Sequence, residues 1–299
     1  MPGELLHPEY FKAPFDMGIG RSLERQLATG PDTPPENPAQ GRYAPPELTV
    51  LIQSINDQPG EIGALLDDVE QAALAYGQTR VKKLIVATGP IWRGTRERAR
   101  YQQAEVITTD IAPDLRSRLI RTGLEAAESD IVFTTVGHAQ LTNRRILATA
   151  AHYAVRPDFG GAFGLPLRGR HATLPEWAGA RALGLDVRFS RGPKQISPKV
   201  GAVGGIGLMG ADCSVLRHSV VKELGGFDES FGFGGADGNF GHLALEAGLT
   251  VTRDPRLSVH HTDGLGARES LRLVRAWSQM GENRPFIYED WVWHHHLGL

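Results

Sequence analysis

The sequence LTVLIQSINDQPGEIGALLDDVEQAALAYGQTRVKKLIVA spans residues 48 to 87 and alternates two kinds of pattern. Residues 48–55 form a short apolar run, which is typical of a strand buried on both faces. Residues 60–76 place apolar side chains three and four positions apart, as one face of an amphipathic helix does. Residues 81–87 are a second apolar run. A helix between two buried strands predicts a crossover connection and a parallel sheet.

The same alternation continues after residue 87. Strands are expected at 105–108 and 131–134, and helices at 114–128 and 143–154. We therefore expect an α/β fold with a doubly wound, mostly parallel sheet flanked by helices. Ligands of such sheets bind beyond the carboxyl ends of the strands, so the loops there are the first candidates for a site. Those loops are 53–58, 87–95 and 134–141.

The second half of the chain is less regular. Residues 156–212 are rich in glycine and carry few periodic runs. Beyond them the pattern predicts a helix that glycines at 225 and 226 terminate, then a second helix, a short strand and a third helix. Their expected ranges are 214–224, 237–247, 249–252 and 267–280.

Residues 204–261 read GGIGLMGADCSVLRHSVVKELGGFDESFGFGGADGNFGHLALEAGLTVTRDPRLSVHH. This segment resembles the C-terminal half of the family 2 glycosyltransferases, which have a GT-A fold. Gly225 to Glu229 match the GGFDE motif of that family. Asp237 matches the second residue of its acidic ED motif, and alanine replaces the first. Gly248 and His260 fall at the expected later positions. The resemblance implies a GT-A-like domain over about residues 48–262.

The first half is similar to the family, but it lacks several of the family's residues on the donor side. LTVLIQSIND at 48–57 resembles the opening strand, and Asn56 matches its asparagine. LIVATGP at 84–90 resembles the second strand, but Ala87 and Thr88 stand where the family has uracil-contacting acids. Only Gly89 matches there. The resemblance therefore implies that a nucleotide, expected to be UDP-linked, lies over the loops around Ser54, Asn56 and Gly89.

The metal-binding motif of the family is degenerate. SDIVFTTVGHAQLT at 129–142 resembles the segment that carries the DxD motif, with Thr135 and Gly137 replacing both aspartates. In the family those acids hold a divalent metal and the diphosphate. The resemblance still implies that the diphosphate lies near Thr135 to His138. The missing acids argue against a resident Mn²⁺ or Mg²⁺ held in the family's manner.

Two other ways of holding the diphosphate remain open. His138 and His260, completed by Asp212 or His261, are a candidate metal site, because two histidines with a carboxylate bind divalent ions. The alternative is metal-free and uses cations and backbone donors. Its candidate cations are Arg93, Arg118, Arg121 and Lys199.

Asp237 is the candidate catalytic residue. An inverting transfer needs a base that takes the proton of the acceptor hydroxyl, and Asp237 matches the family's catalytic acid. The competing interpretation is that Asp237 only caps the helix that follows it. Asp228, Glu229 and Asp212 are expected on the acceptor side of the site.

Composition excludes several classes of protein. The 299 residues include 32 Lys and Arg against 34 Asp and Glu, so there is no general attraction to nucleic acid or anionic membrane. No stretch approaches the ~20 apolar residues of a membrane span, and no leader is visible. The single cysteine, Cys213, excludes an intrachain disulfide framework. We expect a soluble, cytoplasmic protein.

Three regions are expected along the chain. Residues 1–46 form an arm with six prolines between 31 and 46, residues 47–265 form the glycosyltransferase-like domain, and residues 266–299 form a helical tail. Aromatic residues at 10, 11 and 15 suggest that the arm packs on a partner subunit in a homo-oligomer. A loosely ordered terminus explains the same composition.

The leading functional hypothesis is a glycosyltransferase with a nucleotide-sugar donor and a small-molecule or glycan acceptor. A non-catalytic relative that binds a sugar nucleotide or a protein partner is the alternative, because both DxD acids are missing. A nucleotidyltransferase is disfavoured, since LIQSINDQPG at 51–60 lacks the basic, glycine-rich signature of that class.

Overall fold

In the computed structural model, the largest element among the described residues is a mixed eight-stranded sheet. The structure describes residues 45–55, 57–89, 91–110, 116–164, 166–167, 193–196, 212–229, 236–261 and 268. The predicted proline-rich arm lies outside these residues except at positions 45 and 46. The predicted helix at 267–280 also lies outside them except at position 268.

The N-terminal half of the sheet is parallel, as the sequence predicts. Strand β1 (Leu48–Ile55) pairs in parallel with β2 (Val81–Thr88) on one side and with β4 (Ile131–Val136) on the other. Strand β3 (Ala104–Thr109) extends the sheet beyond β2, also in parallel. Seven of the eight residues of β1 are buried, because helices cover both of its faces.

The C-terminal half of the sheet mixes directions. Strand β9 (Cys213–Arg217) runs antiparallel between β4 and β6 (Phe159–Phe163). Strand β10 (Thr250–Arg253) is parallel to β6, and β8 (Lys194–Ile196) is antiparallel to β10. The strand order is β3-β2-β1-β4-β9-β6-β10-β8. All strands except β9 and β8 therefore end at one edge of the sheet, the carboxyl edge.

A second, small sheet lies beyond the first. It contains β5 (Gln140–Leu141), β11 (Val259–His260) and β7 (Pro166–Leu167), with β11 in the middle. Strand β5 follows β4 and strand β11 follows β10. The small sheet therefore ties the continuations of two strands of the main sheet together.

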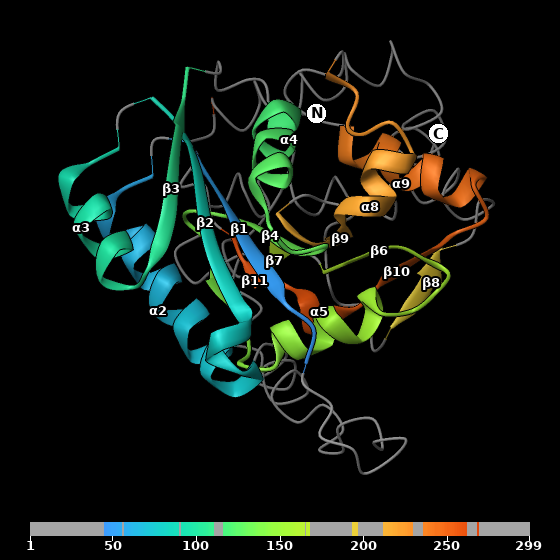
Figure 1. The fold of residues 1–299 in the computed structure, drawn as a ribbon, viewed down its shortest axis with the longest axis horizontal. Helices are drawn as coiled ribbons and strands as arrows, with labels where there is room; N and C mark the ends of the chain where they lie inside the picture. Colours follow the sequence, from blue (N-terminus) through green and yellow to red (C-terminus); the bar gives the residue numbers. More distant parts are fainter. Residues whose placement is uncertain are drawn as a thin grey trace, which may run out of the picture. The chain divides into compact units, whose positions relative to one another are not determined.

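Helices cover both faces of the main sheet (Figure 1). On one face lie α2 (Pro59–Tyr76), α3 (Arg93–Tyr101) and α5 (Ile146–Ala154), and on the other lie α4 (Arg116–Ala126), α8 (His218–Glu223) and α9 (Ala236–Glu246). Each face has its own cluster of buried apolar side chains. The described residues also include two single turns of 3₁₀ helix, η3 (Gln78–Arg80) and η6 (Pro255–Leu257). None of the described helices combines the length and the apolar character that crossing a bilayer requires.

One predicted helix is wrong in its first half. The sequence analysis expects a helix at 214–224, but β9 occupies Cys213–Arg217 and only His218–Glu223 are helical. The first four residues of β9 are buried. A strand buried on both faces lacks alternation and resembles a helical segment in sequence.

The glycines of GGFDE end α8 as the sequence predicts. Gly225 and Gly226 have φ values of +88° and +83°, which side chains other than glycine rarely adopt. The Gly226 amide donates to the Val221 carbonyl at 2.8 Å, which satisfies one of the last carbonyls of the helix. The turn directs Phe227 into the core beneath α9, where its ring lies 5.1 Å from that of Phe240.

Candidate functional site at the carboxyl edge

Polar side chains from four separate segments gather at the carboxyl edge of the sheet. Asp57 follows β1, His138 follows β4, and His261 follows β11. Asp212 precedes β9, which is reversed and so begins at this edge. The two loops that the sequence analysis places here, 53–58 and 134–141, both contribute.

Asp57 is the residue that anchors this site, although the sequence analysis did not select it. Its carboxylate is only 3% exposed. The Ile55 amide donates to Asp57 Oδ2 at 3.1 Å, and Asp57 Oδ1 lies 2.5 Å from His138 Nδ1. Burial of a carboxylate requires such partners, because an unpaired buried charge is costly. Its sequence neighbour Asn56, which the resemblance favours, lies outside the described residues.

Position 137 has no room for a side chain, because the Asp57 carboxylate lies against it. A Cβ atom at Gly137 would lie 2.2 Å from Asp57 Oδ2, well inside contact distance. The Gly137 amide also donates to the Gln53 carbonyl at 2.8 Å, so the backbone is held in place. The Asp57 carboxylate thus fills the space in which an aspartate at position 137 would begin. The acidic group at this point of the sheet comes from the end of β1 instead of β4.

His138 and His261 face each other beside Asp57. Their Nε2 atoms are 2.8 Å apart, and their ring centroids are 4.7 Å apart. On the far side, His261 Nδ1 lies 3.2 Å from Asp212 Oδ2, in an electrostatic contact that is not aligned as a hydrogen bond. The four side chains form a row in the order Asp57, His138, His261, Asp212. We call this row the edge cluster.

The edge cluster is largely shielded from solvent. The side chain of His261 is 6% exposed and that of Asp212 is 20% exposed. A cavity of about 10 Å³ lies next to His138 and is also lined by Gln53, Ile55 and Val136. Such a volume is about that of one water molecule.

His261 rather than His260 joins the edge cluster. His260 lies in β11, opposite Gln140 of β5, whereas His261 follows the strand and its amide donates to the Leu167 carbonyl at 2.7 Å. Successive residues of an extended chain point to opposite sides, so a shift of one residue selects a different histidine. The sequence analysis considered His261 only as an additional ligand.

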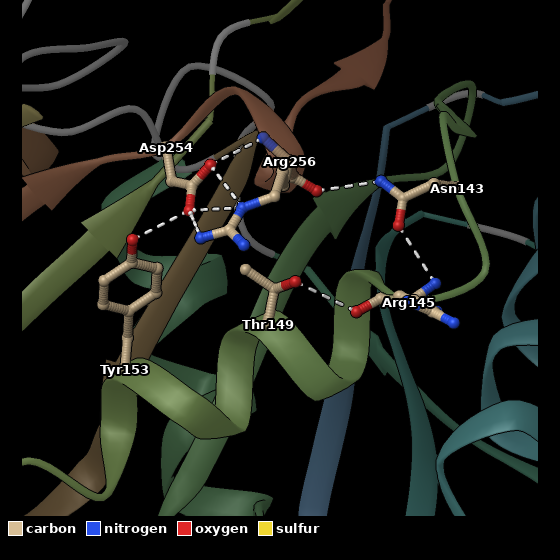
Figure 2. Close-up of polar contacts among 6 residues, drawn as sticks. All are labelled: Asn143, Arg145, Thr149, Tyr153, Asp254 and Arg256. Carbon is tan, nitrogen blue, oxygen red and sulfur yellow. Dashed lines mark hydrogen bonds and ion pairs between the residues drawn. The ribbon is translucent and has the colours of Figure 1, made fainter. Parts of the chain in front are cut away.

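A buried polar network holds the segment that leads to His261 (Figure 2). Asp254 is completely buried and accepts hydrogen bonds from the Tyr153 hydroxyl at 2.8 Å and from the Arg256 guanidinium. Asn143 donates to the Arg256 carbonyl at 2.9 Å. Asn143 precedes α5 and Tyr153 lies near its end, so this network fixes η6, which leads into β11, to the helix below (Figure 2).

Arg121, a predicted donor-binding residue, is engaged with GGFDE. Both Arg118 and Arg121 of α4 form ion pairs with Glu229, and the Arg118 Nη2 to Glu229 Oε2 distance is 3.0 Å. Arg121 also lies 3.7 Å from Glu125. Glu229, predicted on the acceptor side, therefore links the GGFDE turn to α4. Its neighbour Asp228 is exposed.

Asp237 lies in the first turn of α9, one residue inside the helix. Its Oδ1 accepts a hydrogen bond from the Gly238 amide at 2.8 Å, and the side chain is partly exposed. A carboxylate in the first helical turn is favoured by the helix dipole. Helix α9 packs on β6 and β10 and leads directly into the start of β10. Its first turn, with Asp237, therefore lies toward the carboxyl edge.

The remaining predicted donor residues are backbone positions or buried. Ser54 is 4% exposed and Thr135 is fully buried inside the sheet, where it pairs with Cys213 of β9. Gly89 follows β2, has a φ of +70°, and donates through its amide to the Thr109 carbonyl at 3.1 Å. Gly89 is therefore at the carboxyl edge, as the sequence analysis expects.

The DxD positions cannot hold a metal ion in this chain. Thr135 is buried and Gly137 has no side chain, so neither supplies a carboxylate. In the part of the chain that the structure describes, no three His, Cys, Asp or Glu side chains converge as metal ligands.

Comparison of the sequence with protein-family models and with curated proteins found no match. Solved structures do resemble it. A mannosyltransferase from Pyrobaculum calidifontis, PcManGT, in complex with GDP-Man and Mn²⁺, matches with a TM-score of 0.57 at 16% identity. The match covers 95% of this chain and 79% of that one.

S. aureus TarS (residues 1–349) in complex with UDP-GlcNAc matches with a TM-score of 0.56 at 12% identity. That match covers 82% of this chain and 71% of the other. The chain therefore has the fold of the GT-A-type glycosyltransferases, as the sequence predicts.

Proposed function

We propose that this protein is a glycosyltransferase that moves a sugar from a nucleotide-sugar donor to a small-molecule or glycan acceptor. The observation that carries the proposal is the collection of buried and partly buried polar groups at the carboxyl edge of a GT-A-type sheet. Asp57, His138, His261 and Asp212 come from four segments and meet at one place. Ligands of open α/β sheets bind at this edge.

Asp237 is the general base in this proposal, and the transfer inverts the anomeric carbon. A general base needs a carboxylate that is accessible to the acceptor, and Asp237 is partly exposed in the first turn of α9. The Gly238 amide donates to Asp237 Oδ1 at 2.8 Å and so orients the carboxylate. The acceptor binds on the side of GGFDE and Asp212, and the donor binds over Ser54, Asn56 and Gly89.

A second candidate function is supported by the DxD positions. Thr135 and Gly137 supply no acid at the end of β4, and a chain without donor chemistry would bind a sugar nucleotide or a protein partner without turnover. The edge cluster supports the catalytic alternative, because ionisable side chains that gather in a largely shielded place are costly to keep without a use.

A panel of nucleotide sugars tests the two candidates together. GDP-Man and UDP-GlcNAc, the donors in the similar structures, are the first members, with UDP-glucose and UDP-galactose added. Thermal shift reports binding, and release of free UDP or GDP in the presence of glycan acceptors reports transfer. Binding with release supports the enzyme, and NMR of the product then gives the anomeric configuration. Binding without release supports the non-catalytic alternative. The absence of both binding and release would contradict both candidates.

A further inference from the structure

Strand β3 leaves one side of the main sheet open. Among the described residues it is the last strand at its end of the sheet, and it pairs only with β2 (Figure 1). None of its six residues is buried, and the side chains of Glu105 and Thr108 are exposed. The outer side of β3 therefore presents a row of backbone amide and carbonyl groups that no neighbouring strand of the described chain pairs with.

The devices that usually protect an edge strand are not found in β3. Proteins shield such edges with prolines, bulges, lysines or a covering segment. Strand β3 contains no proline, keeps a continuous register with β2, and carries Glu105 as its one charge. Val106 packs on the apolar cluster on the α2 side of the sheet. Because neighbouring residues of a strand point to opposite faces, Glu105 lies on the other face.

Helix α3 lines the open edge with arginine side chains. The helix packs on α2 and on β3, and the ion pair of Arg98 with Asp67 marks the side that faces α2. Residues two positions apart on a helix differ by about 200° in direction, so Arg96 and Arg100 point away from α2, toward the open edge. Both are exposed, and neither forms an ion pair with another described residue.

The residues beside these two arginines leave their charge available. Glu97, the one acidic residue of α3, is paired with Arg93. Trp92, four residues before Arg96 and therefore in the same row, is 56% exposed. Exposed tryptophan and arginine side chains are the types that contribute most to binding at protein interfaces.

We infer that the open edge of β3 binds an extended segment of a partner protein that carries acidic side chains at alternate positions. An added strand pairs its backbone with an exposed sheet edge and directs alternate side chains to one face. Those side chains are about 6.6–6.8 Å apart. Arg96 and Arg100 are one helical turn apart, which is about 6 Å along α3. Two acids on one face of the added strand therefore each meet one arginine.

The backbone edge and the charge together select this kind of partner. Membranes and nucleic acids would attract the arginines, but they have no peptide backbone that pairs with β3. A second copy of this chain, paired through its own β3 about a twofold axis, would bring both copies of Arg96 and Arg100 together, and like charges repel. An acidic segment of a different protein satisfies both the backbone groups and the arginines.

The test uses the full chain and a labelled peptide, Thr-Val-Glu-Val-Glu-Val-Thr, without any nucleotide sugar. Its failure would therefore leave the proposed sugar transfer untouched. Fluorescence anisotropy measures the affinity, and we expect saturable binding that weakens as NaCl is raised from about 0.1 M to about 1 M. The same peptide with lysine in place of both glutamates should not bind. Hydrogen–deuterium exchange should slow over residues 104–109 when the acidic peptide is bound.

Matched variants locate the binding surface. Arg96→Gln and Arg100→Gln are exposed changes that should leave folding intact, and each should weaken peptide binding ~2–5-fold, as expected for one exposed ion pair. Lys222→Gln, an exposed change on α8, should retain full affinity. No binding of the acidic peptide, equal binding of the lysine peptide, or binding that leaves exchange over residues 104–109 unchanged overturns the inference.

Discussion

At the scale of single residues, Asp57 and Gly137 explain how this chain differs from family members that carry a DxD motif. The carboxylate of Asp57 and a side chain at 137 compete for the same space, because a Cβ there would lie 2.2 Å from Asp57 Oδ2. A chain that has the Asp57 carboxylate in this place therefore has no room for a side chain at position 137. Asp57 then holds His138 at 2.5 Å, so the exchange also fixes the first histidine of the edge cluster.

Gly137→Ala tests this competition. The added methyl group must displace the buried Asp57 carboxylate, so we expect the free energy of unfolding to fall by ~1–3 kcal/mol, as in other overpacked sites. The control is Gly63→Ala in α2, where a Cβ meets nothing within 4 Å, and where alanine should stabilise the helix by ~0.5–1 kcal/mol. Urea unfolding measures both. Equal stability of the two variants would contradict the close contact.

Asp237→Asn tests the proposed general base. The amide oxygen of asparagine accepts the same bond from the Gly238 amide, so we expect normal folding and normal donor affinity. Turnover should fall by ~10²-fold or more, the scale of a lost general base. Asp67→Asn on α2 serves as the control and should keep full turnover. A near wild-type rate for Asp237→Asn would remove this residue from the mechanism.

At the scale of elements, the sequence predicts the parallel half of the sheet better than the mixed half. Strand β1 agrees with its predicted range of 48–55, because a buried parallel strand is a continuous apolar run. Helix α3 was missed, since only Thr95 and Ala99 of its nine residues are buried and no apolar face is visible in sequence. Strand β6, FGGAF, was missed because its glycines resemble a loop.

Part of the candidate site was predictable in the same way. The loops after β1 and β4 were expected from the strand pattern, and His138 was selected within one of them. Asp57 was not selected, because its partner lies 81 residues away in sequence. The choice between His260 and His261 depends on where β11 ends, and a one-residue shift reverses the direction of a side chain.

Tyr153→Phe tests the network that fixes η6 to α5. The variant removes a hydrogen bond to the buried Asp254 carboxylate, and such bonds to charged groups contribute ~1.5–3 kcal/mol. We expect the free energy of unfolding to fall by that amount at pH 8. Tyr101→Phe changes an exposed ring and should have no effect.

The loss should depend on pH. Burial and the neighbouring Asp254 raise the pKa of Tyr153 from 10 to about 12. The neutral phenol therefore stabilises the folded state fully below pH 10, and this contribution falls at ~1.4 kcal/mol per pH unit as the pH rises toward 12. Urea unfolding at pH 8 and pH 11 should show a smaller difference between wild type and Tyr153→Phe at the higher pH. An unchanged difference would contradict burial of the hydroxyl.

At the scale of the whole molecule, the site exists only after the sheet has formed. His138 and His261 are 123 residues apart in sequence, and Asp57 is 81 residues from His138. The strands that carry them meet because β1 pairs with β4 and the small sheet joins β5 to β11. In the proposed function, the donor binds at this one edge of the sheet.

Hydrogen–deuterium exchange with and without a bound nucleotide sugar tests this placement most directly. The amides of Ile55, Gly137 and His261 lie at the carboxyl edge, and those of His218 and Thr250 lie at the opposite edge. We predict that the donor slows exchange in peptides that contain the first three and leaves peptides with the last two unchanged. Protection at His218 or Thr250, without protection at Gly137 and His261, would contradict a donor site at the carboxyl edge.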